Sequence, residues 1–153
     1  MNRKLFAAAQ IHGSDEYPNI NGLVKFQQTP QGVLVTADIC GLPKIESCYG
    51  VFAFHIHGGS CCTGNETDPF ADAGTHYDPC DAPHPYHAGD LPPLFANNGR
   101  AYMSVLTSRF TVDEIIGKTV IIHSRPDDFT TQPSGNAGEK IACGVVCTNS
   151  RFN

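Results

Sequence analysis

Alternating apolar and polar residues are the main pattern along this chain, and they predict β-strands. In residues 33–39 the odd-numbered positions are apolar, whereas Thr36 and Asp38 face the other way. A period of two residues indicates a strand with one buried face. Turn residues separate the apolar segments, as at 29–32. The pattern predicts strands at 5–11, 23–27, 33–39, 48–57, 100–106, 119–123 and 141–147.

Two long segments, residues 60–93 and 124–138, lack this periodicity and are rich in Gly, Pro and Asp. A loop longer than about 15 residues in a compact domain is usually functional or disordered. Metal binding can order such a loop, because the ligands tie distant parts of it together. One helical turn is predicted at 112–116. We therefore expect an all-β sandwich or barrel with two long functional loops.

The composition limits the number of domains and the classes of partner. The 153 residues suit a single domain, 1–153, that is large enough to bury a core. The net charge is −5 and no basic stripe is present, so no nucleic-acid partner is expected. No apolar run approaches the roughly 20 residues that span a bilayer, so no membrane partner is expected either. An anionic substrate would be attracted only by local cations or metal ions, against the overall charge.

The first residues and the cysteines bear on the cellular compartment. The apolar stretch 5–9 is too short for a signal peptide and continues into the first predicted strand. The chain is therefore expected to be a full-length cytoplasmic protein or the mature form of a periplasmic or secreted one. Seven cysteines favour an oxidising compartment, because cytosolic disulfides are uncommon. Their odd number leaves at least one cysteine without an intrachain partner.

Histidines on two predicted strands suggest a metal site. His55 and His57 form an H-x-H pair, so both imidazoles project from one face of their strand and suit a common metal ion. The same pair would also suit the polar surface of an ordinary strand. His123 ends an apolar predicted strand and by itself could be an edge histidine. Imidazole ligands without thiolate suit copper and zinc, among other metals.

A denser group of candidate ligands lies in the first long loop. Three imidazoles and one carboxylate fall within residues 76–90, and such a set suits tetrahedral zinc. Its members are His76, His84, His87 and Asp90. The other acidic residues of this loop are expected to cap turns. They are Asp68, Asp72, Asp78 and Asp81.

Several motifs occur in the order and approximate spacing of a known family, over about residues 5 to 147. They are Phe54-His55-Ile56-His57 and the segments 73–79, 87–92, 122–123, 135–138 and 142–145. They resemble those of Cu,Zn superoxide dismutase, more closely its bacterial than its animal branch. The resemblance implies a flattened eight-stranded Greek-key β-barrel, which agrees with the strand pattern. It also allows a homodimer, because the family is often dimeric, whereas the sequence itself leaves the oligomeric state open.

The resemblance implies one copper and one zinc per subunit, with superoxide as the substrate. The implied copper ligands are His55, His57, His76 and His123. The implied zinc ligands are His76, His84, His87 and Asp90. His76 would bridge the two ions as an imidazolate. In the implied reaction one superoxide reduces copper and leaves as dioxygen, His76 takes up a proton, and a second superoxide becomes hydrogen peroxide.

Three further site residues follow from the resemblance. Asp127 matches a carboxylate that links ligands of the two ions, although an aspartate at this position also suits a plain turn. Lys140 stands where the family carries an arginine in the channel to copper, and Arg125 matches a steering cation. Each of these two could also be an ordinary surface residue. Lysine keeps the charge but loses the planar two-pronged donor, so we expect activity that is retained at a reduced rate.

The zinc loop and the cysteines depart from the family pattern. His84 and His87 are only three residues apart, closer than is usual in the family. The implied disulfide joins Cys143 to Cys61 or Cys62, with the spacing slightly in favour of Cys61, and would close a loop of about 80 residues. Cys80 could be a zinc ligand, a partner of Cys62, or inert. The other additional cysteines are Cys40, Cys48 and Cys147.

Two other functions deserve comparison with superoxide dismutation. A non-catalytic homologue that binds copper and zinc is compatible with Lys140, although the complete copper ligand set argues against it. A zinc hydrolase is disfavoured, because four protein ligands leave no open position on zinc and no general base lies nearby.

Overall fold

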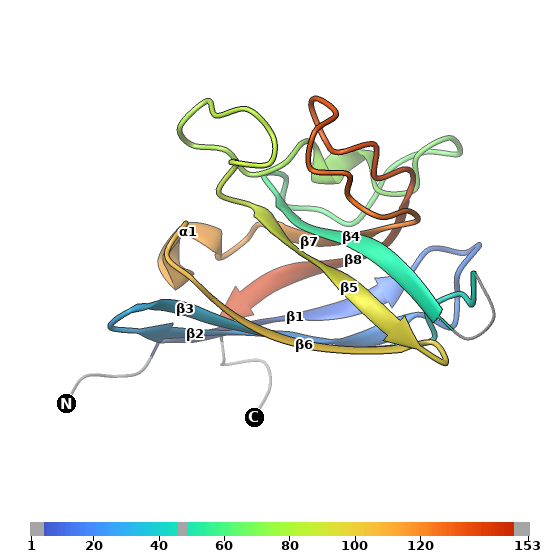
Figure 1. The fold of residues 1–153 in the computed structure, drawn as a ribbon, viewed down its shortest axis with the longest axis horizontal. Coiled ribbons are helices and arrows are strands. Elements are labelled where there is room, and N and C mark those ends of the chain that lie inside the picture. Colours follow the sequence, from blue (N-terminus) through green and yellow to red (C-terminus); the bar gives the residue numbers. More distant parts are fainter. Residues whose placement is uncertain (1–4, 46–48, 149–153) are drawn as a thin grey trace.

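The computed structural model describes residues 5–45 and 49–148, which form eight strands in a closed antiparallel barrel (Figure 1). The strand order is β1-β2-β3-β6-β5-β4-β7-β8. Because β3 lies beside β6 and β4 beside β7, the chain crosses the barrel in the Greek-key manner. The predicted all-β barrel is thus confirmed. The strands are β1 (Phe6–Gly13), β2 (Asn21–Thr29), β3 (Gly32–Cys40), β4 (Tyr49–His57), β5 (Asp90–Asn97), β6 (Arg100–Thr107), β7 (Thr119–His123) and β8 (Lys140–Thr148).

Alternating strand residues fill the barrel with apolar side chains. On β3 the four odd-numbered residues 33–39 are fully buried, as the pattern predicts. Phe26, Phe52 and Phe54 are the largest fully buried side chains. The helical turn α1 (Val112–Ile115) adds two buried residues to this core. None of the helices among the described residues is long and apolar enough to cross a membrane.

The strand β5 was not among the predicted strands, because Pro92 and Pro93 suggested loop. Proline has no backbone N–H to donate to the hydrogen bonds between strands, and it is therefore found in edge strands and at bulges. Here the pairing of β4 with β5 shifts register between Phe52 and Phe54, opposite the two prolines. The N–H of Ala53 at this bulge donates to the carbonyl of Arg125 instead (2.8 Å).

A second, smaller core lies outside the barrel wall and supports the first long loop. Every residue of β7 is buried, including Ile121, which points away from the barrel interior. Ile121 packs with Phe70, Ala73 and Cys143. Both long loops gather on this side of the barrel, over β4 and β7 (Figure 1). The fold therefore encloses the outer face of β4, which carries the H-x-H pair.

Candidate metal centre

The end of β4 brings loop residue His76 to the H-x-H pair. Phe54 and Ile56 face the barrel core, so His55 and His57 lie on the opposite face, where the loops bury them. His57 and His76 pair as an isolated antiparallel bridge. The N–H of Tyr77 donates to the carbonyl of Ile56 (2.8 Å), which extends this pairing.

The loop returns to β4 at Gly89. The N–H of Ile56 donates to the carbonyl of Gly89 (2.8 Å), and any Cβ at this position would collide with the carbonyl of Ile56. Glycine therefore permits the close approach that places Asp90 next to the histidines.

Four buried imidazoles converge on one point above the barrel wall. Their nearest ring nitrogens all lie within 4.8 Å of one another, and they belong to His55, His57, His76 and His123. Nδ1 of His57 donates to the carbonyl of Gly74 (2.8 Å), and Nδ1 of His123 to that of Gly138 (3.3 Å). These bonds leave Nε2 of both rings as the ligand atoms, and the two Nε2 atoms lie 3.3 Å apart.

A second group of four buried side chains shares His76 with the first. Its members are His76, His84, His87 and Asp90. Nδ1 of His76 lies 2.8 Å from Oδ1 of Asp90. Nδ1 of His84 and Nδ1 of His87 each lie 3.1 Å from Oδ2 of the same carboxylate. His76 thus presents Nδ1 to this group and Nε2 to the other.

Unpaired buried nitrogens show that the two groups fit metal ions. Among the described residues, the buried side-chain atoms without a hydrogen-bond partner are Nδ1 of His55, Nε2 of His76 and Nδ1 of His84. Nδ1 of His84 lies near Asp90 but has no proton to donate, because Nε2 of this ring donates to Asp127. A buried polar atom without a partner costs about 1–3 kcal/mol. Each of these three atoms belongs to one of the two groups of converging ligands, and one metal ion in each group would satisfy all of them. Imidazole and carboxylate donors suit copper and zinc.

Asp127 connects the two ligand groups through its carboxylate. Oδ2 accepts a hydrogen bond from Nε2 of His55, and Oδ1 accepts one from Nε2 of His84, both at 2.8 Å. Oδ1 also accepts from the N–H of Phe129, so Asp127 caps a turn as well as linking the histidines. Burial alone would raise the pKa of Asp127, but the hydrogen bonds from His55 and His84 hold this pKa well below its usual value.

Burial favours the neutral, metal-binding form of His55, His57 and His123. It is the main cause that lowers the pKa of His55 and His57, and neighbouring imidazoles act in the same direction, whereas the hydrogen bond to Asp127 partly offsets the shift of His55. Burial, together with His55 and His76, lowers the pKa of His123 to about 3. Burial alone would raise the pKa of Asp90. The hydrogen bond and charge of His76, together with His84, keep this pKa below its usual value, so the carboxylate stays ionised.

Comparison with known proteins agrees with this geometry. Residues 20–146 match the family model described as copper/zinc superoxide dismutase. The chain belongs to the copper/zinc superoxide dismutase family. The Cu-Zn superoxide dismutase of Legionella pneumophila is 36% identical over 146 residues, which cover 90% of this chain and 85% of that protein. That of Photobacterium leiognathi is 34% identical over 139 residues, with 82% and 78% covered. The solved structure of the Brucella abortus Cu/Zn superoxide dismutase superposes with a TM-score of 0.77 at 26% identity, covering 92% of this chain and 98% of that one.

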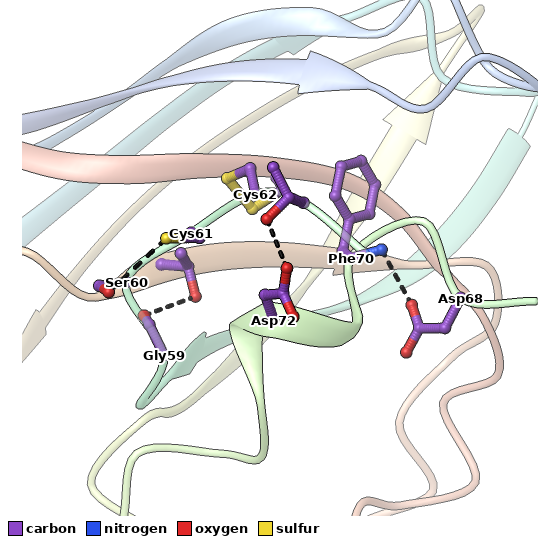
Figure 2. The surroundings of a disulfide bond; sticks show 10 residues. Gly59, Ser60, Cys61, Cys62, Asp68, Phe70 and Asp72 are labelled. Carbon is purple, nitrogen blue, oxygen red and sulfur yellow. Dashed lines mark hydrogen bonds between the residues drawn. A yellow bond between two sulfur atoms is a disulfide. The ribbon is translucent and has the colours of Figure 1, made fainter. Parts of the chain in front are cut away.

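The disulfide of this superoxide dismutase-family chain joins Cys62 to Cys143, with a Cα–Cα distance of 5.7 Å. The slight preference for Cys61 is therefore wrong, and the alternative, Cys62, is confirmed. Cys62 packs against the small core that contains Cys143, whereas the neighbouring Cys61 is exposed beside Ser60 (Figure 2). Sequence spacing cannot tell which of two adjacent residues faces a core.

The remaining cysteines lie apart from the metal centre. Cys40 and Cys80 are exposed thiols and Cys147 is a half-buried one. Cys80 is therefore not the partner of Cys62, and it belongs to neither ligand group. Cys48, where the fourth strand was predicted to begin, lies outside the described residues.

Lys140 and Arg125 both line a cavity of about 830 Å³ that opens onto the ligand groups, where it reaches His57, His76, His87 and His123. Nζ of Lys140 forms an ion pair with Asp68 (2.5 Å). Nη2 of Arg125 donates to Oδ1 of Asn136 (3.2 Å). Both candidate steering cations are thus at the mouth of the site.

Two residues that hold the short zinc loop carried no signal in the sequence. Nη1 of Arg109 donates to the carbonyls of Pro85 (2.9 Å), His87 (3.2 Å) and Asp90 (3.1 Å). The side-chain amide of Gln132 accepts from the N–H of His84 (2.9 Å) and donates to its carbonyl (2.7 Å). These contacts orient the backbone around His84, which explains how so short a loop presents this side chain.

Proposed function

We propose that this chain catalyses the dismutation of superoxide to dioxygen and hydrogen peroxide, at a copper ion bridged through His76 to a zinc ion. Two superoxide anions and two protons give one dioxygen and one hydrogen peroxide. The observation that carries the proposal is the position of His76, whose two ring nitrogens belong to two different groups of converging ligands. The names of the family relatives support the same activity.

In this proposal the two ligand groups hold different metals. The four-imidazole group binds copper, which supplies the one-electron couple that superoxide chemistry needs. Its residues are His55, His57, His76 and His123. The group with the carboxylate suits zinc, which has no redox chemistry and keeps His76 in place. Its residues are His76, His84, His87 and Asp90.

His76 and the two cations act on substrate and product. Nε2 of His76 can hold a proton whenever it is not a metal ligand, and His76 lines the cavity, so this proton can reach a forming peroxide. Arg125 and Lys140 line the cavity, and the positive charge there that is left unpaired attracts the anion against the net charge of −5. Asp127 keeps an N–H on Nε2 of His55 and of His84, so that Nδ1 of each remains a ligand.

Metal reconstitution tests the proposal. The metal-free protein is loaded with copper and zinc, and metal content and superoxide decay are measured on the same sample. We expect one copper, one zinc and dismutation at the reduced rate that Lys140 implies, with copper lost from the His55→Ala, His57→Ala double variant. A sample that holds one copper and one zinc without dismutation would instead support a non-catalytic metal-binding homologue.

A homodimer stays a prediction from the family resemblance. Sedimentation equilibrium of the metal-loaded protein measures its mass and decides between a monomer and a dimer.

A further inference from the structure

The cavity above the metal centre carries more acidic than basic residues. The basic side chains that line it are Arg125 and Lys140. The acidic ones are Glu16, Glu66, Asp68, Asp78 and Glu139. The attraction of an anion into this cavity therefore depends on how far nearby carboxylates already neutralise each of the two cations.

Lys140 is paired with one of these carboxylates, whereas Arg125 is not. Nζ of Lys140 lies 2.5 Å from Oδ2 of Asp68, and the lysine side chain is only 16% exposed. Arg125 instead donates to the neutral amide of Asn136, and no ion pair of Arg125 is found among residues 5–45 and 49–148. Opposite charges this close cancel most of each other's field at a distance.

The loop fixes Asp68 in its position beside Lys140. Oδ1 of Asp68 accepts a hydrogen bond from the N–H of Phe70 (3.0 Å), and its backbone carbonyl accepts from Asn65 (2.9 Å) and Ala71 (3.2 Å). Phe70 packs against Cys143 in the small core next to the disulfide. Figure 2 shows Asp68, Phe70 and the disulfide of Cys62 in this one loop. The carboxylate is thus held by the fold and does not depend on the lysine for its place.

We propose that Asp68 is a positioning residue that restrains and neutralises Lys140, so that Arg125 supplies most of the unpaired positive charge for an incoming anion. This inference rests on the proposed function, because it concerns the same cavity and an anionic substrate. The reduced rate expected for this chain then arises from Asp68 together with Lys140, and not from the lysine alone.

Azide, a small anion that binds copper(II), probes the cavity without turnover. In the copper- and zinc-loaded Asp68→Asn variant we expect azide affinity and the rate of superoxide decay to rise about threefold, with a steeper decrease as ionic strength increases. Lys140→Gln should remove this gain when it is introduced into the Asp68→Asn background. Asp72→Asn is the matched control, because Asp72 lies in the same loop, is bonded to Thr63 and does not line the cavity.

A second comparison leaves Asp68 unchanged, in case its replacement disturbs the loop. Arg125→Gln should weaken azide binding more than Lys140→Gln does. The proposal is wrong if Asp68→Asn leaves azide affinity unchanged or lowers it, or if Lys140→Gln weakens azide binding as much as Arg125→Gln. Azide affinity does not require turnover, so these outcomes are distinct from a failure of the proposed dismutation.

Discussion

Nε2 of His84 lies 2.8 Å from Oδ1 of Asp127, a residue 43 positions further along the chain. The other oxygen of the same carboxylate accepts a hydrogen bond from His55. One side chain from the second long loop therefore fixes the ring orientation of a ligand in each group. It also selects the tautomer in which Nδ1 of both rings can bind metal.

Replacing Asp127 by asparagine should weaken zinc binding about 10- to 100-fold, because the amide cannot accept from both imidazoles. Competition with a chromophoric chelator measures the zinc affinity. Asp128→Asn is the control, since the neighbouring carboxylate is bonded to Thr130 and Thr131 and to neither histidine. Equal zinc affinity in the Asp127 variant and the wild type would show that the carboxylate does not orient His84.

Arg109 should be needed to hold the short loop that presents His84 and His87. Arg109→Gln removes the donor that contacts three loop carbonyls, so we expect zinc affinity to fall about tenfold and the loop to become accessible to protease. Arg100→Gln provides a matched control, because Arg100 pairs with Asp38 on the exposed barrel surface and, within residues 5–45 and 49–148, with no part of the zinc loop. If both variants bound zinc as the wild type does, Arg109 would have no role in positioning this loop.

The two adjacent cysteines should differ in their effect on stability. The bond between Cys62 and Cys143 spans 81 positions, and a disulfide that closes such a loop is worth up to about 4–5 kcal/mol. Cys62→Ser should therefore lower the free energy of unfolding by several kcal/mol, whereas Cys61→Ser should change it by less than about 1 kcal/mol. Urea denaturation under non-reducing conditions measures both, and peptide mapping identifies the bridge. A cost for Cys61→Ser equal to that for Cys62→Ser would contradict this pairing.

Local patterns in the sequence predicted most of the fold and the histidines of the site. The two-residue period of a strand was enough to predict that His55 and His57 share a site, because both imidazoles project from the same face of β4. β5 was missed because two prolines interrupt its pattern at a bulge.

The supporting contacts of the site could not be predicted, because they join distant segments. Arg109 meets carbonyls 19 to 24 positions away, and Lys140 meets Asp68 72 positions away. Asp68 was expected to cap a turn and does so, but the sequence around it does not indicate that its carboxylate also pairs with Lys140. Likewise, the choice of Cys62 over Cys61 depends on which way the folded loop turns its side chains.

The metal-free protein should lose stability as the pH falls. Burial depresses the pKa of His57 and His123 in the folded state, for His123 to about 3, whereas an unfolded histidine titrates near pH 6.5. Between these values the unfolded chain binds more protons, so the free energy of unfolding decreases from about pH 6.5 downwards. Urea denaturation of the metal-free protein at about pH 7.5 and about pH 5 measures the change. Equal or greater stability at the lower pH would contradict the burial of neutral imidazoles.

In the proposed site the imidazole of His76 joins two metal ions. Loading the protein with copper(II) and with cobalt(II) in place of zinc tests this directly, because both ions are paramagnetic and a bridging imidazolate couples their spins. We predict that the copper electron paramagnetic resonance signal is strongly attenuated in the copper–cobalt protein and intact in the copper–zinc protein. An intact copper signal from a sample shown to hold one copper and one cobalt per chain would contradict the bridged site.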